Sequence, residues 1–333
     1  MRALVTGGGG FLGEYVIDHL LARGDRVRNL ARGNYSHLAA KGVECVSADL
    51  RDATAVREAC RGVDVVYHVA GLAGIWGPWA QYYGINVQGT QNVIAGCFAH
   101  GVPKLVYTSS PSVTFDGRAQ EGIDETAPYP QRWLCYYPQT KALAEQAVLA
   151  ASGPALATCA LRPHLIWGPR DRHLIPRLIE RARRGQLRRV GDGKNLVDMV
   201  YVDNAAAAHM QAADALSPGS PVAGRAYFIT QGEPVNCWDW IDEILSLAGL
   251  PPVRRIISVN AAWAIGATLE GVYTALRLQS EPRMTRFLAA QLGTSHWFNI
   301  DRARADFGFA PQVSTAEGMR RLADSLRQFD GPS

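Results

Sequence analysis

A glycine-rich turn near the N-terminus constrains the fold of this chain more than any other feature. An apolar run at residues 3–5 leads into Thr-Gly-Gly-Gly-Gly-Phe-Leu-Gly at residues 6–13, which contains glycines at GxxGxxG spacing. Glycine permits a tight turn and a close approach of the backbone, and the free N–H groups at a helix N-terminus attract a pyrophosphate. The motif therefore predicts a dinucleotide site formed by Gly7, Gly10, Phe11 and Leu12. A turn that serves only packing is the alternative.

The remainder of the chain alternates short apolar runs with helical patterns. The apolar runs lie at 27–30, 43–46, 65–69, 105–107, 157–161 and 225–230, and the helical patterns at 11–22, 53–60, 87–99 and 137–150. Such runs, separated by amphipathic helices, are typical of a parallel sheet that is covered on both faces. We expect an α/β fold, a doubly wound parallel sheet (Rossmann) with a smaller, mainly helical C-terminal substrate lobe. Residues 1–166 and 196–232 are assigned to the cofactor domain, and residues 167–195 and 233–333 to the lobe.

Composition excludes several classes of protein. Of the 333 residues, 47% are apolar and 19% charged, and the net charge of +4 is too small to imply a nucleic-acid partner. The six cysteines are scattered and lack metal-ligand spacing, so neither a metal site nor a disulfide framework is expected. No apolar run approaches the roughly 18 residues that a membrane span requires. Because the first strand begins at Arg2, we expect no targeting segment and a cytoplasmic protein.

The second strand bears on the choice of cofactor. NAD sites usually place a carboxylate at the end of this strand, where it binds the ribose 2′-hydroxyl. Here no Asp or Glu occurs between Asp25 and Glu44, and Arg32 follows the strand instead. A guanidinium matches the geometry of a 2′-phosphate. The sequence therefore favours NADP(H), with NAD(H) as the alternative if Arg32 is an ordinary surface residue.

Three side chains predict the chemistry. Tyr137 and Lys141 are four residues apart, so they share one face of the helix at 137–150, and an adjacent ammonium favours a phenolate. The chain has only four lysines among 34 basic residues, which makes a generic surface role for Lys141 less plausible. Tyr137 is the expected proton donor or acceptor. Ser110, at the carboxyl edge of the sheet, is expected to bind the reacting oxygen in preference to Ser109, which is assigned to the cofactor. An ordinary turn at this strand end is the alternative.

With these residues assembled, the sequence resembles the extended short-chain dehydrogenase/reductases, in the branch related to 3β-hydroxysteroid dehydrogenases. The shared motifs lie at 6–13, 49–50, 68–71, 86–93, 107–110, 137–141, 161–163 and 167–169. The resemblance implies that Asp49 and Leu50 flank the adenine and that Ala70 and Gly71 lie along the cofactor. It also implies that Asn86 orders the active site, that Pro163 begins the segment beside the nicotinamide, and that Lys141 holds the nicotinamide ribose. Homodimers are common in this family.

Several stretches, at 32–35, 161–177, 190–204 and 281–297, look most similar to the bacterial 2-alkyl-3-oxoalkanoate reductases of olefin and β-lactone biosynthesis. This resemblance implies that NADPH reduces the ketone of a long-chain 2-alkyl-3-oxoalkanoic acid, in an assembly with a condensing enzyme and a β-lactone synthetase. The same stretches resemble sterol-4α-carboxylate 3-dehydrogenases, so oxidation of a 3β-hydroxysteroid or sterol carboxylate is the first alternative. Epimerase or dehydratase action on a nucleotide sugar is a further alternative. It is disfavoured because the lobe looks apolar, whereas a sugar nucleotide needs polar partners. A non-catalytic NADP(H) sensor is a further alternative. It is disfavoured because a sensor would not need the intact set of Ser110, Tyr137 and Lys141.

Substrate contacts are predicted less sharply. Leu72, Trp76 and Phe115 are candidates for an apolar pocket, and Arg172 and His173 for meeting a substrate carboxylate. His164 is also placed near the substrate, although a structural histidine is the more frequent case. Residues 260–278 form a helical pattern with Glu270 and Arg277 as its only charges. This helix is expected to roof the pocket, to pack in the core of the lobe, or to make a peripheral membrane contact.

Overall fold

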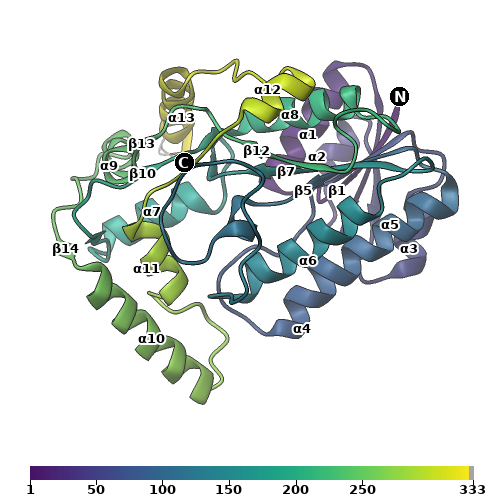
Figure 1. The fold of residues 1–333 in the computed structure, drawn as a ribbon. Coiled ribbons are helices and arrows are strands. Elements are labelled where there is room, and N and C mark those ends of the chain that lie inside the picture. The colour runs from purple at the N-terminus through teal and green to yellow at the C-terminus, as the bar shows by residue number, and fades with distance from the viewer. Residues whose placement is uncertain (330–333) are drawn as a thin grey trace.

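A parallel sheet of seven strands forms the centre of the molecule (Figure 1). The computed structural model describes residues 1–329. The strand order is β12-β7-β5-β4-β1-β2-β3, and every neighbouring pair is parallel. The strands are β1 (Arg2–Thr6), β2 (Arg26–Ala31), β3 (Glu44–Ser47), β4 (Val65–His68), β5 (Lys104–Thr108), β7 (Ala157–Pro163) and β12 (Arg225–Ile229).

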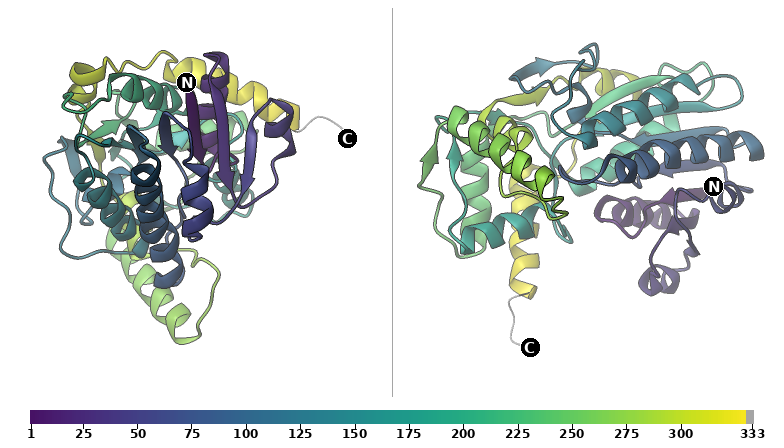
Figure 2. Two further views of the ribbon diagram at one scale, coloured as in Figure 1. Left: turned by 90° about the vertical axis from the view of Figure 1, so that its right-hand side faces the viewer. Right: turned by 90° about the horizontal axis from the view of Figure 1, so that it is seen from below.

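Helices cover both faces of this sheet (Figure 2). One face carries α1 (Phe11–Ala22) and α8 (Val202–Ala215), which pack side by side. The other carries α3 (Ala53–Ala59), α5 (Gly89–His100) and α6 (Tyr136–Ala150). The predicted doubly wound fold is confirmed, because short apolar strands buried on both faces need helices on both sides. The shorter α2 (Ser36–Ala40), α4 (Trp79–Tyr82), a π-helix (Tyr83–Gln88) and a 3₁₀ turn (Pro111–Thr114) lie in the connections.

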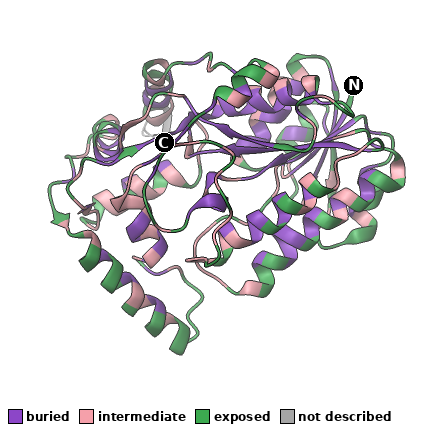
Figure 3. Ribbon diagram, viewed as in Figure 1, coloured by how far each residue is buried: buried purple, intermediate pink, exposed green. Residues whose placement is uncertain are grey.

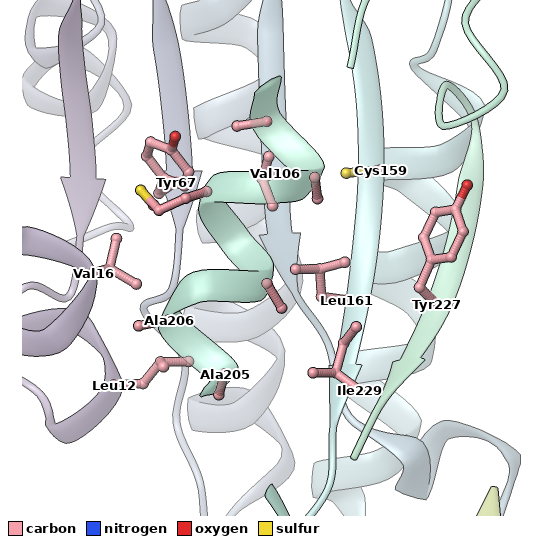
Figure 4. Close-up of a cluster of buried hydrophobic side chains, with 14 of the residues drawn as sticks. Leu12, Val16, Tyr67, Val106, Cys159, Leu161, Ala205, Ala206, Tyr227 and Ile229 are labelled. Atoms are coloured by element: carbon pink, nitrogen blue, oxygen red, sulfur yellow. The ribbon is translucent and has the colours of Figure 1, made fainter. Parts of the chain in front are cut away.

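The larger apolar core lies between the sheet and the pair α1 and α8. Alanines on α8, among them Ala205 and Ala206, let this helix approach strands that carry Tyr67, Val106 and Leu161 (Figure 4). All five side chains are fully buried. Small residues on the helix let the large ones on the strands pack closely between the two layers.

The second part of the molecule is mainly helical. It contains α7 (Leu174–Arg183), α9 (Cys237–Leu247), α10 (Val259–Ala275), α11 (Arg286–Gly293) and α13 (Thr315–Phe329) around its own apolar core. Short strands that sequence periodicity did not reveal join them: a sheet β13-β10-β15-β6 and the pairs β11-β8 and β14-β9. Their bounds are β6 (Gln120–Ile123), β8 (Ile166–Trp167), β9 (Arg189–Val190), β10 (Leu196–Val197), β11 (Val200–Tyr201), β13 (Val235–Asn236), β14 (Ile256–Ile257) and β15 (His296–Phe298).

The division into two parts stays a prediction, and three segments pack across the expected boundaries. Strand β6, within 1–166, pairs with β15, and β10, within 196–232, pairs with β13. In the opposite direction, α12 (Asp301–Phe307) packs on α8 and β12, and the Tyr227 hydroxyl donates to Asp306 at 2.7 Å. The two parts therefore share strands and contacts at several points along the chain. None of the helices within residues 1–329 combines the length and apolarity that a bilayer crossing requires.

Candidate functional site

A cavity of about 930 Å³ lies at the carboxyl ends of the central strands. Its walls come from the glycine-rich turn after β1, the ends of β2, β4, β5 and β7, the start of α6, and the lobe segments around α11 and β15. Eighteen of the residues predicted from sequence line it: Gly7, Gly10, Phe11, Leu12, Arg32, Asp49, Leu50, Ala70, Gly71, Leu72, Ser109, Ser110, Phe115, Tyr137, Lys141, Pro163, His164 and His173. Ligands of open parallel sheets bind in this position.

The glycine-rich turn forms a cradle that fits a pyrophosphate. Gly7 has φ of 74°, and a Cβ at this position would lie 2.8 Å from the Cα of Ala70. A Cβ on Gly13 would overlap the Gly7 carbonyl oxygen, so helix α1 begins as close to the strand as a backbone can approach. Asn29 on β2 stabilises the turn, since its Oδ1 accepts a hydrogen bond of 2.9 Å from the N–H of Gly8. The residues present therefore fit a dinucleotide.

Arg32 and Asp49 line the end of the cavity beyond β2 and β3. Arg32 is exposed. The Asp49 carboxylate accepts hydrogen bonds from the Arg51 guanidinium at 2.8 and 2.9 Å, and this contact lowers the pKa of Asp49 to about 2. With Asp49 already paired, the guanidinium of Arg32 is a cation available to a ligand at this end.

Tyr137 and Ser110 are brought together as predicted. Tyr137 lies in the first turn of α6, and its phenol lines the same cavity as the Ser110 hydroxyl. Ser110 follows β5 and caps the 3₁₀ turn, where its Oγ lies 2.8 Å from the Oγ of Ser112. Burial raises the pKa of Tyr137, because a phenolate is poorly solvated there, while the nearby Ser110 hydroxyl acts in the opposite direction. Ser109 lines the same cavity, and its buried Oγ has no partner among the described residues.

Lys141 is fully enclosed one helical turn further on. Its ammonium donates to the carbonyl oxygen of Thr108, and burial lowers its pKa to about 7. The expectation that an adjacent ammonium lowers the pKa of Tyr137 is not met, since desolvation is the largest influence on the phenol and raises its pKa. Lys141 nevertheless lines the cavity beside Tyr137 and Gly71.

Asn86 acts through the backbone of the loop that follows β4. It lies in the π-helix, is buried, and does not itself line the cavity. Its Oδ1 accepts from the N–H of Leu72 at 2.7 Å, and its Nδ2 donates to the Leu72 carbonyl and to the Thr140 hydroxyl. Asn86 thereby fixes the loop at Gly71 and Leu72 against α6.

The lobe end of the cavity is apolar with a few polar groups. Phe115 meets Phe287 of α11 edge to face, with ring centroids 5.7 Å apart. His164 is buried, and its Nδ1 lies 2.7 Å from the Asp198 carbonyl oxygen. Burial and the neighbouring His296 hold the pKa of His164 well below its usual value, so this ring is neutral at physiological pH. A neutral, hydrogen-bonded histidine agrees with the structural role expected for His164.

Two predicted substrate residues lie away from the cavity wall. The Trp76 indole N–H donates to the Leu278 carbonyl at 3.0 Å, and its ring packs edge to face on Tyr273 of α10. The guanidinium of Arg172 pairs with Glu14 of α1 at 3.1 Å. The hydrogen bond and ring contact of Trp76, and the ion pair of Arg172, hold these side chains away from the cavity.

Sequence reasoning missed several lining residues. Ser112 partners Ser110, and Tyr35, Phe287, Gln291 and His296 also line the cavity. The residues of α11 and β15 come from nearly two hundred positions beyond β5, so no local spacing relates them to the catalytic residues. The similarity of residues 281–297 to reductases was the one signal that could have found them.

The glycine cradle and the Tyr137 and Ser110 hydroxyls in one cavity at the edge of a doubly wound sheet define an NAD(P)-dependent oxidoreductase acting on CH–OH and C=O groups. The model of the 3-beta hydroxysteroid dehydrogenase/isomerase family matches residues 4–258. The chain belongs to this family, which confirms the resemblance found in the sequence.

Known proteins resemble the chain over nearly its whole length. It is 50% identical to a 2-alkyl-3-oxoalkanoate reductase of Stenotrophomonas maltophilia, over 98% of this chain and 99% of that protein. It is 36% identical to the human sterol-4-alpha-carboxylate 3-dehydrogenase, decarboxylating, over 98% and 89% of the two chains. Among solved structures, MoeE5 in complex with UDP-glucose and NAD superposes with a TM-score of 0.75 at 26% identity, covering 99% of both chains.

Proposed function

We propose that the protein reduces the ketone of a long-chain 2-alkyl-3-oxoalkanoic acid to the 2-alkyl-3-hydroxyalkanoic acid with NADPH. The observation that carries this proposal is the 50% identity to a protein named 2-alkyl-3-oxoalkanoate reductase. The apolar lobe end of the cavity, with Leu72, Phe115 and Phe287 in its walls, suits a hydrocarbon substrate. The product belongs to olefin or β-lactone biosynthesis.

The chain's own residues supply the proton and the binding of the oxygen. When bound, the nicotinamide supplies the hydride that adds to the carbonyl carbon. The Ser110 hydroxyl binds the carbonyl oxygen, and Tyr137 donates its phenolic proton to that oxygen as negative charge develops on it. The raised pKa of Tyr137 keeps the phenol protonated at neutral pH, which suits reduction. Lys141, fixed by Thr108, holds the nicotinamide ribose and lies beside Tyr137.

Cofactor preference rests on Arg32. Its guanidinium is available at the end of the cavity beyond β2, while the nearby Asp49 is paired with Arg51. A 2′-phosphate would meet this cation, whereas a 2′-hydroxyl would gain little from it. These points support NADP(H) over NAD(H). Gly7, Gly10, Phe11 and Leu12 hold the pyrophosphate, and Leu50, Ala70, Gly71, Ser109 and Pro163 lie along the rest of the cofactor.

Oxidation of a 3-hydroxyl on a sterol carboxylate is the second candidate. The same three residues run this reaction in reverse, and the 36% identity to the human decarboxylating dehydrogenase supports it. A 4-carboxylate next to the new ketone would leave readily as CO₂. The first candidate is preferred because its relative is closer in sequence.

The proposed setting is cytoplasmic, as a homodimer that associates with a condensing enzyme and a β-lactone synthetase. Support for a dimer comes from α5 and α6, where Phe98, Tyr136 and Leu143 are exposed. The only charged residues of these helices other than a histidine are Lys141 and Glu145, and both are buried. An uncharged pair of helices with exposed apolar side chains suits packing against a second copy.

The test follows cofactor reduction at its absorbance maximum. Purified protein is offered a 2-alkyl-3-hydroxyalkanoic acid with NADP⁺ or NAD⁺, and a 3β-hydroxysteroid and a sterol 4α-carboxylate in parallel. The hydroxy acid is used because the keto acid decarboxylates in solution. Turnover of the hydroxy acid with NADP⁺ preferred supports the proposal. Turnover of a sterol substrate alone would move the protein to the second candidate, and efficient turnover with NAD⁺ alone would contradict the role given to Arg32.

A further inference from the structure

Helix α10 is the most exposed apolar element of the described chain. Twelve large hydrophobic side chains within that part of the chain are exposed, and six of them fall between residues 256 and 278. Trp263 is 45% exposed and Leu276 is 65% exposed. The helix lies at the outer edge of the lobe, where Figure 3 shows exposed residues along most of its length. Exposed apolar residues gathered on one element indicate an interaction surface.

The two sides of α10 differ in a regular way. Ala262, Gly266 and Glu270 are buried and spaced four residues apart, so they form one stripe that faces α11. Glu270 accepts hydrogen bonds from the backbone and side chain of Arg286, at 2.7 and 2.6 Å. Thus the only charged residue of α10 is used internally.

A second stripe of α10, next to the buried one, consists of Ile265, Val272 and Leu276, the last of which directly follows the helix. The side chains of all three are at least 44% exposed. Positions 7 and 11 residues apart lie on nearly the same face of a helix. The stripe therefore forms a continuous apolar ridge without a charged side chain.

Arginines are concentrated in the segments around this ridge. Residues 174–189, which include α7, and residues 251–286, which include α10, together contain eleven arginines and three glutamates. They contain no lysine and no aspartate. Their combined net charge is +8, whereas the whole chain has +4, so the remainder of the molecule is net negative. Positive charge is thus a property of this region and not of the chain as a whole.

Some of these arginines line a second hollow, of about 340 Å³, together with Glu180, Gln186 and Glu281. Arg177 pairs with Glu281, which belongs to the segment that follows α10, so α7 lies beside that segment. Burial and the charges of Arg177 and Arg283 lower the pKa of Arg181. An arginine whose surroundings disfavour its charge gains from an anion placed in the hollow.

We propose that the ridge of α10 and the arginine hollow of α7 together dock the protein on an anionic lipid bilayer. Ile265, Val272 and Leu276 enter the headgroup layer, and Arg177, Arg181 and Arg184 bind lipid phosphates. Charge complementarity selects an anionic bilayer over a neutral one, since the region has eleven cations and three anions. Because α10 packs on α11, whose Phe287 and Gln291 line the large cavity, docking holds the apolar end of that cavity near the membrane. The surface does not depend on which substrate the enzyme turns over.

Flotation of the full-length protein with lipid vesicles tests this inference. Vesicles of phosphatidylglycerol and phosphatidylcholine in equal parts are compared with vesicles of phosphatidylcholine alone. We expect the bound fraction to be about tenfold higher on the anionic vesicles and to fall as salt is added. Equal binding to both vesicle types, or binding to neither, would overturn the proposal.

Matched variants locate the contact. The double variant Ile265→Ser with Leu276→Ser is expected to lower anionic vesicle binding about tenfold, as is Arg181→Gln with Arg184→Gln. Leu196→Ser removes an exposed leucine from β10, outside the ridge, and is expected to bind as the parent protein does. Circular dichroism and light scattering of each variant confirm folding and oligomeric state. If the α10 variant binds vesicles normally but loses its oligomeric state, the ridge is a protein interface and the membrane proposal is wrong.

Discussion

The ammonium group of Lys141 lies 4.2 Å from the centroid of the Tyr107 ring, in a fully enclosed position below the end of β5. Its folded-state pKa of about 7 is well below the value of 10.5 that an unfolded chain has. Between these two values the unfolded chain binds more protons than the folded one, so stability rises with pH. We expect the free energy of unfolding of the cofactor-free enzyme to gain about 2 kcal/mol from Lys141 between pH 7 and pH 9.

Urea unfolding across this pH range, in the parent protein and in Lys141→Met, measures the effect. The variant removes the titrating group, so its free energy of unfolding should rise less steeply with pH than that of the parent protein. An identical slope in both proteins would show that the lysine is not desolvated in solution.

Replacement of the Tyr137 phenol should abolish most of the activity without unfolding the protein. Tyr137→Phe removes only the phenolic hydroxyl, and loss of a general acid lowers kcat by about 10² to 10⁴ fold. Tyr136→Phe is the matched control, because this neighbouring tyrosine is exposed and packs on Trp79. Steady-state kinetics should separate the two variants, and comparable turnover in both would remove Tyr137 from the mechanism.

Arg32 should determine the discrimination between the two nicotinamide cofactors. Arg32→Ser is expected to raise KM for NADP⁺ by about 10 to 100 fold, the value of one or two charge-assisted hydrogen bonds, and to leave KM for NAD⁺ nearly unchanged. Arg26→Ser serves as the control, since Arg26 is exposed at the opposite end of the same strand. Equal changes for both cofactors would mean that Arg32 does not meet the 2′-phosphate.

The buried pair of Glu145 and Arg162 should dominate stability near the catalytic helix. The two side chains are at most 3% exposed, and the Arg162 guanidinium donates to Glu145 at 2.6 and 3.0 Å. Glu145→Gln leaves a buried guanidinium without its counter-charge, which should cost about 3 to 5 kcal/mol. In the exposed pair of Glu180 and Arg184, Glu180→Gln should change stability by about 0.5 kcal/mol or less. Chemical denaturation of both variants makes the comparison; similar losses would contradict it.

The seven strands of the central sheet and the helices α1, α3, α5 and α6 were predictable, because each strand contains a short apolar run and each of these helices has a helical apolar pattern. Helix α8 was not predicted. Tyr137, Ser110 and the glycine turn were predictable for a related reason: the carboxyl ends of parallel strands meet at one edge, so motifs that follow different strands converge there. The short strands of the lobe, such as β9 and β14, have two residues each. Two residues have no measurable periodicity, so their pairing depends on tertiary contacts.

The substrate end was predicted less well, and Trp76 shows why. Its position in an apolar loop after β4 suggested a pocket wall, but its indole N–H found the Leu278 carbonyl more than two hundred residues away. A long-range hydrogen bond of this kind cannot be inferred from local sequence. The pKa of Tyr137 was misjudged for a similar reason, since burial depends on the packing of the whole site and not on the spacing to Lys141.

Helix α8 enters the chain late, and this order has a consequence for synthesis. Six of the seven strands of the sheet are complete by residue 163. Helix α8, which covers one face of these strands, follows only at Val202–Ala215, and the edge strand β12 ends at Ile229. A growing chain therefore displays an uncovered apolar surface until α8 has been synthesised and has left the ribosome. Chaperone binding during translation should be strongest in this interval.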